Sequence, residues 1–102
     1  MSKSNSVQRE VTRGEILRQL AEAFPSWLTR RSLLNLLDLA GYSVLEEDMD
    51  FHLEYLRAKR LLEFQIHDGG VGKPKVIAII RITADGIDLL DGRKAGDPGV
   101  RI

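Results

Sequence analysis

The chain has 102 residues, of which 43% are hydrophobic and 29% are charged, and it contains no cysteine. This length favours one small domain that buries roughly 65% of the surface of its unfolded chain, and the lack of cysteine excludes disulfides and thiolate chemistry. Fifteen basic and fifteen acidic residues balance, so any nucleic-acid site must be a local basic patch.

The first segment is polar and predicts a flexible arm over residues 1–10. A domain over residues 11–92 follows, and the composition of residues 93–102 is typical of a tail. Thr12 and Glu15 have the spacing of a capping box, which predicts that the first helix begins at Thr12. Apolar residues at helical spacing continue this helix until Pro25 ends it.

The second helix is expected to begin after Thr29, a residue type that caps helix N-termini. Leucines then surround most of its circumference, and Gly41 provides a left-handed C-terminal cap. Arg30 and Arg31 lie in the first turn, where positive charge opposes the helix dipole. They indicate either a phosphate-binding site or a simple solvated pair of arginines.

The third helix is expected to begin at a second capping box, formed by Ser43 and Glu46. Its buried stripe should consist of apolar residues at helical spacing, namely Leu45, Met49, Leu53 and Leu56. Acidic residues share the opposite face. Phe51 and Tyr55 lie away from the stripe, so they are candidates for covering another surface.

Residues 62–67 alternate apolar and polar, residues 68–74 form a glycine-rich turn, and residues 75–82 are rich in β-branched residues. This pattern predicts a two-stranded hairpin. Its second strand should place Val76, Ala78, Ile80 and Ile82 on one face and Ile77 and Ile79 on the other. Both faces are then apolar, and a partner subunit could cover the second one. Thr83 caps a last helix.

The segments AGYSVLEEDMDFHLEYLRAKRLLEF and IRITADGIDLL resemble the winged helix-turn-helix superfamily, in particular its MarR-like and PadR-like branches. The resemblance covers Thr12 to Asp91 and implies an α+β fold with a three-helix core, a two-stranded wing and a C-terminal helix. The ending GRKAGDPGV is similar to uncharacterised small winged-helix proteins of Mu-like prophages. The superfamily resemblance also implies a homodimer that binds DNA with the third helix in the major groove.

The third helix departs from that pattern because its exposed first turns carry Glu46, Glu47 and Asp50. Major-groove readers place Arg, Lys, Asn or Gln there, since these side chains donate to base edges. Acids at a helix N-terminus also complement the helix dipole, which is a purely structural reason for their position. Alternatively, the helix presents an acidic face to a protein partner.

Two functions therefore stay open: a phage-type, DNA-binding regulator, or a winged-helix interaction module that does not read DNA. The expected DNA contacts are Arg30, Arg31, Lys73 and Lys75. The expected partner interface consists of Glu46, Asp50, Phe51, Glu54, Tyr55, Ile77 and Ile79.

Catalysis, metal binding and a cofactor are not expected. His52 and His67 stand alone, without a second ligand at metal-binding spacing. The glycines before Lys73 lack the strand-to-helix context of a phosphate loop. Without a signal peptide or an apolar run of about 20 residues, the sequence predicts a cytoplasmic protein.

Overall fold

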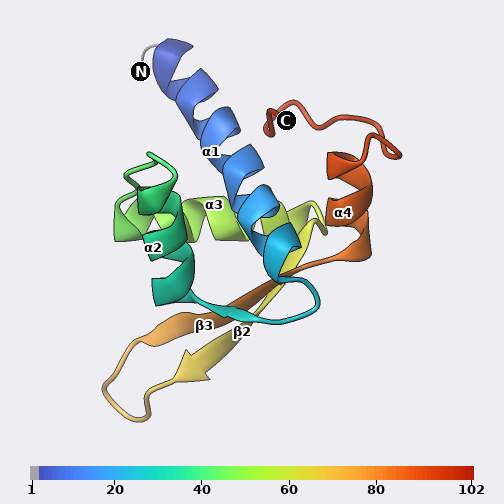
Figure 1. Ribbon diagram of the computed structural model, residues 1–102. Coiled ribbons are helices and arrows are strands. Elements are labelled where there is room, and N and C mark those ends of the chain that lie inside the picture. The colour runs from blue at the N-terminus through green and yellow to red at the C-terminus, as the bar shows by residue number, and fades with distance from the viewer. Residues whose placement is uncertain (1–2) are drawn as a thin grey trace.

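The computed structural model describes residues 3–102, with side chains from residue 6 onward. Four helices and a three-stranded antiparallel sheet of order β1-β3-β2 confirm the predicted α+β class (Figure 1). The elements are α1 (Lys3–Ala23), β1 (Leu28–Thr29), α2 (Arg30–Leu39), α3 (Glu46–Ala58), β2 (Leu62–Asp68), β3 (Lys75–Ile82) and α4 (Ala84–Leu90). Helices α1, α2 and α3 lie together on one side of the sheet, and the β2–β3 hairpin projects beyond them as the wing.

The core is built from leucine, isoleucine and methionine side chains that α1, α2, α3 and the sheet bury against one another. Met49, Leu53 and Leu56 have no exposed surface, which confirms most of the predicted stripe of α3. Leu45 was predicted wrongly, because it is 64% exposed. It precedes the helix as its N-cap residue and therefore does not follow the helical periodicity.

The N-terminal caps of α2 and α4 were predicted correctly. The backbone N–H of Ser32 donates to Thr29 Oγ1 at 3.0 Å, and that of Gly86 donates to Thr83 Oγ1 at 3.1 Å. Gly41 follows α2 with a φ of 92°, as predicted for a left-handed cap. The capping box at Ser43 was wrong, because α3 begins at Glu46 without a side-chain cap.

Helix α1 begins at Lys3, well before the predicted start at Thr12. Thr12 lies inside the helix and is only 5% exposed, so it caps nothing. The predicted arm is wrong over residues 3–10, and residues 1 and 2 lie outside the described part of the chain. Contacts with distant segments hold this part of α1: the backbone N–H of Arg101 donates to the carbonyl of Glu10 at 3.0 Å.

Strand β1 was not predicted; it pairs Leu28 with Ile80 and Thr29 with Ile79. The hairpin was predicted correctly, but its register shifts between Gln65 and Ile66, because Ile79 faces the former and Ile77 the latter. The extra residue on β3 is a β-bulge, which breaks the alternation of faces. Ile77 is therefore only 9% exposed and joins the core beside Ile80, so the predicted division of β3 into two apolar faces was wrong.

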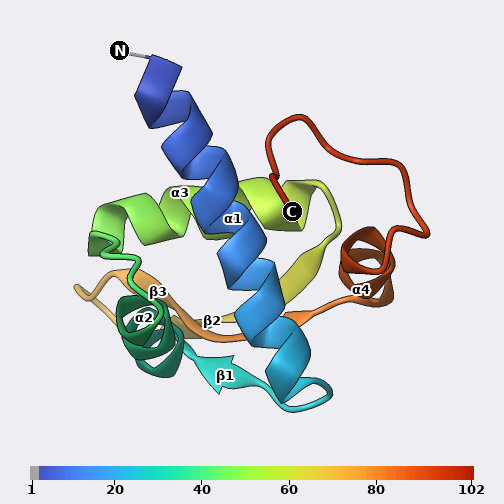
Figure 2. The same ribbon diagram turned by 45° about the horizontal axis from the view of Figure 1, so that its top comes forward.

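Residues 93–102, named here the C-terminal strap, fold back from α4 toward α1 and α3 (Figure 2). Val100 is 7% exposed and belongs to the core, so the prediction of a simple tail was wrong. A Cβ atom on Gly14 of α1 would overlap the carbonyl oxygen of Arg101, which shows how closely the strap lies against α1. The hydroxyl of Tyr55 donates to Asp97 Oδ1 at 2.7 Å and ties the strap to α3.

Within residues 3–102, no helix combines the length and apolar composition that crossing a bilayer requires.

Candidate nucleic-acid and protein interface

Arg30, at the start of α2, is bound by the acidic face of α3. Its Nε and Nη2 atoms donate to Asp50 Oδ1 at 3.1 and 3.0 Å, and Nη1 donates to Glu46 Oε1 at 3.2 Å. Nη2 also donates to the backbone carbonyl of Glu46 at 2.7 Å. We name this set of contacts the Arg30 clasp. It explains why an arginine is stable where the dipole of α2 disfavours it, because the carboxylates of α3 compensate its charge.

The clasp brings together residues that the sequence had assigned to different functions. Arg30 was an expected DNA contact, whereas Glu46 and Asp50 were expected to face a protein partner. The Arg30 side chain is 20% exposed and its donors point at carboxylates. A phosphate would have to displace these carboxylates to reach it.

A groove of about 550 Å³ lies between α3 and the wing. We name it the α3–wing groove. Its lining residues are Arg30, Glu46, Glu47, Asp50, Glu54, Ile66, Lys75, Val76 and Ile77. One wall is therefore acidic and belongs to α3, while the other is mainly aliphatic and belongs to the wing. Four of the expected partner residues meet here: Glu46, Asp50, Glu54 and Ile77.

The other expected partner residues lie elsewhere. Phe51 is 73% exposed but lines a second cavity, beside α1. Tyr55 is half-buried next to the strap, and the Arg13 guanidinium carbon lies 3.9 Å from its ring centroid. Ile79 directly precedes the buried Ile80 in β3 and faces the opposite side of the sheet. The single predicted interface is thus divided among separate surfaces.

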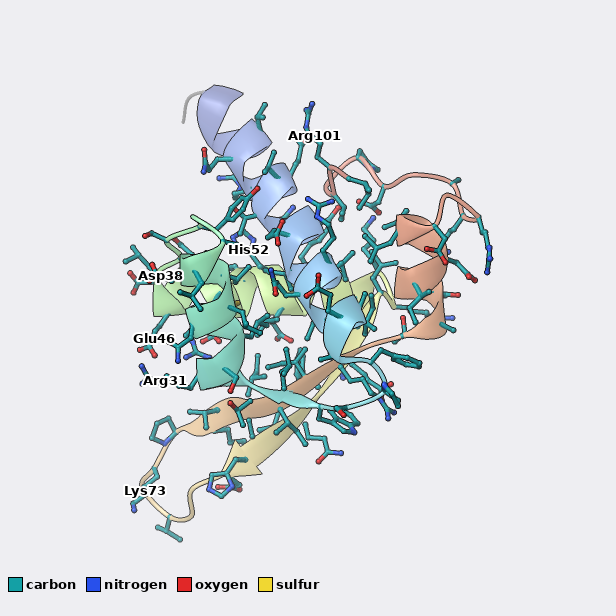
Figure 3. The ribbon with its side chains drawn as sticks, in the orientation of Figure 1. Arg31, Asp38, Glu46, His52, Lys73 and Arg101 are labelled. Carbon is teal, nitrogen blue, oxygen red and sulfur yellow. The ribbon has the colours of Figure 1, made fainter. Side chains whose placement is uncertain are left out.

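Arg31 and Lys73 are exposed, on α2 and at the tip of the wing (Figure 3). Neither forms an ion pair with any residue from Ser6 to Ile102. In Figure 3, Arg31 lies between the labelled side chains of Glu46 and Lys73. Lys75 lines the groove itself. The four expected DNA contacts therefore comprise one clasped arginine, one groove lysine and two open cations.

The cavity beside Phe51 has a volume of about 620 Å³ and lies between α1, α3 and the loop before α3. Its lining residues are Gln8, Arg9, Thr12, Arg13, Tyr42, Ser43, Val44, Asp48, Phe51 and His52. Sequence patterns did not predict this cavity, because its walls come from segments that are distant along the chain.

His52 is 5% exposed, and its Nδ1 accepts a hydrogen bond from Arg13 Nε at 3.2 Å. Burial, and then the positive charge of Arg13, lower the pKa of His52 to about 4. The imidazole is therefore neutral at neutral pH. Arg13 Nη1 also donates to the carbonyl of Gly99 at 3.1 Å, so this network joins α1, α3 and the strap. Among the described residues, no group of three His, Cys, Asp or Glu side chains could hold a metal ion.

No protein-family model and no curated protein sequence matches the chain. Its fold is similar to the X-ray structure of a PadR-like transcription factor from Bacteroides fragilis, with a TM-score of 0.62. The two sequences are 15% identical, and the match covers 90% of this chain and 85% of the other. At this identity the likeness concerns the fold alone. The chain therefore has a winged-helix fold like that of the PadR-like protein, with β2 and β3 as its wing.

Proposed function

We propose that the protein is a DNA-binding winged-helix protein of the transcriptional-regulator type, which contacts the duplex backbone without reading bases through α3. The observation that carries this proposal is the exposure of Arg31 and Lys73 on the side where the wing projects. Lys75 in the groove adds a third cation nearby. The likeness to a PadR-like transcription factor supports the same function.

The charge of α3 argues against major-groove reading. Glu46, Glu47 and Asp48 occupy its first turn, where a reading helix presents hydrogen-bond donors to base edges. At about 6 Å, a carboxylate and a phosphate repel each other by roughly 0.7 kcal/mol in water and about 3 kcal/mol near a protein surface. These acids offset the attraction of Arg31 and Lys73, so the expected binding is weak and strongly dependent on salt.

The test is fluorescence anisotropy with a labelled mixed-sequence duplex at stepped salt concentrations. The double change Arg31→Ala, Lys73→Ala should reduce the slope of log K against log salt by about 2, because two phosphate contacts are lost. The matched control is Arg93→Ala, Lys94→Ala, which removes two exposed cations beyond α4. Equal losses in both variants would reject the proposed surface, and lack of salt-dependent binding by the unaltered protein would reject the function.

We also propose that the protein is of phage type, that it acts in the cytoplasm and that it forms a homodimer. The similarity of the ending GRKAGDPGV to Mu-like prophage proteins supports the phage type. The 73% exposed ring of Phe51 supports an apolar contact between two copies. Light scattering should give the mass of a dimer for the unaltered protein and of a monomer for Phe51→Ser. A monomer at every concentration of the unaltered protein would contradict the dimer.

The second candidate function is an interaction module that does not bind DNA. The observation in its favour is the Arg30 clasp, which occupies one of the four expected DNA contacts with carboxylates of α3. The duplex titration separates the two candidates, since only the first requires salt-dependent binding.

A further inference from the structure

We propose that the α3–wing groove binds a basic polypeptide segment in which arginine or lysine side chains alternate with apolar ones. This inference specifies the partner of the interaction module described above. It does not require DNA binding, because it concerns a different ligand and different residues from Arg31 and Lys73.

The acidic wall of the groove contains carboxylates that do not pair with Arg30. Glu46 and Asp50 hold Arg30, whereas Glu47 and Glu54 form no ion pair with any side chain that the structure describes. Four carboxylates against two cations, Arg30 and Lys75, leave the lining with an excess of two negative charges. Such a wall attracts a cationic ligand and repels a phosphate backbone.

The Arg30 clasp indicates which cation suits this wall. A guanidinium donates in a planar fork, and Asp50 accepts from two nitrogens of the same arginine at 3.0 and 3.1 Å. Glu47 and Glu54 belong to the same helix and line the same groove. Arginine side chains from a partner are therefore the best match to these two free carboxylates.

The opposite wall gives the ligand its second property. Ile66 is 56% exposed and Val76 is 47% exposed, although both are large aliphatic side chains beside a charged helix. A small inorganic cation would leave this apolar surface uncovered. A polypeptide can cover both walls at once, because successive side chains of an extended segment point in opposite directions. The volume of about 550 Å³ lies within the usual range of ligand-binding clefts.

The probe for this proposal is a short fluorescein-labelled peptide in which arginine alternates with leucine, titrated with the full chain by anisotropy. A second peptide, with glutamine in place of each arginine, tests the requirement for charge. The arginine peptide should bind with an affinity that falls as salt rises. The glutamine peptide should bind at least about tenfold more weakly.

Three variants locate the binding. Glu47→Gln with Glu54→Gln should weaken the arginine peptide about fivefold, the effect expected for two exposed ion pairs. Ile66→Ser should weaken it about threefold without disturbing the core, since Ile66 is exposed. The matched control is Glu22→Gln with Asp85→Asn, two exposed acids outside the groove, which should leave the affinity within about twofold.

No binding of the arginine peptide would overturn the proposal, as would equal weakening by the groove and control pairs. The same variants are also titrated with duplex DNA. The Glu47→Gln, Glu54→Gln pair should leave duplex affinity unchanged or raise it, since it removes negative charge. A loss of duplex affinity would instead identify the groove as a nucleic-acid site. A protein that binds the peptide but no duplex would retain this inference and lose the proposed DNA function.

Discussion

The hydrogen bond between Tyr55 and Asp97 should contribute measurably to stability, because it anchors the C-terminal strap to α3. At 2.7 Å, with a carboxylate acceptor, it belongs to the class of charge-assisted bonds worth about 1.5–3 kcal/mol. Tyr55→Phe keeps the ring under the Arg13 guanidinium and removes only the hydroxyl. We expect it to lower the free energy of unfolding by about 1.5 kcal/mol, or the melting temperature by roughly 4–8 °C per kcal/mol.

Asp97→Ala should cost more, about 3 kcal/mol, because Asp97 also accepts from the backbone of Gly99 at 2.8 Å and pairs with Lys59 at 3.3 Å. The assay is urea unfolding followed by circular dichroism for both single variants and the double variant. The double variant should be less destabilised than the sum of the two by about 1 kcal/mol or more. Additivity within about 0.3 kcal/mol would refute the inference that this bond holds the strap.

Three further predictions concern single positions. The folded-state pKa of His52 is about 4, below its ordinary value of 6.5, so the unfolded chain binds the proton more readily. The associated stability is fully present above pH 6.5 and is lost as the pH falls toward 4, by about 1–2 kcal/mol after solvent screening; His52→Gln should abolish this part of the pH dependence of urea unfolding. If His52→Gln left the pH dependence of unfolding unchanged, this prediction would be contradicted. Gly14→Ala should destabilise the protein by about 1–2 kcal/mol although alanine favours helices by about 1 kcal/mol, because the new methyl overlaps the Arg101 carbonyl; a higher melting temperature would show that the strap moves freely. Thr83→Ala should lower the melting temperature through a loss of about 1 kcal/mol, whereas Thr83→Ser, which keeps the hydroxyl, should retain most of the stability.

The features that were predictable from the sequence depend on neighbours along the chain. The caps at Thr29 and Thr83 accept from residues three positions later. The buried stripe of α3 and the β-branched composition of β3 likewise depend on residues that are close together in the sequence. These patterns, together with the resemblance of the third helix and the wing to known winged-helix sequences, were sufficient to predict the fold class.

The features that were missed depend on residues far apart in the sequence. Thr12 had the local pattern of a helix cap, but α1 extends beyond it toward the N-terminus, where contacts such as that between Glu10 and Arg101 hold the helix. The bulge in β3 reflects the register against β2, which alternation within a single strand does not encode. At the candidate interface, residue types were recognised but their pairings were not: nothing in the sequence joined Arg30 to Asp50.

The Arg30 clasp couples two opposite properties of one surface. Substitution of Glu46 or Asp50 by a neutral residue removes a negative charge. It also frees some of the hydrogen-bond donors of the Arg30 guanidinium, which the carboxylate had bound. The surface therefore becomes more attractive to phosphate by more than the charge of the substituted residue alone. Both acids are exposed and lie outside the core, so such substitutions cost little folding stability. Substitutions at these two surface positions would therefore shift the charge preference of the surface from cationic toward anionic ligands, while the buried residues that specify the fold remain unchanged.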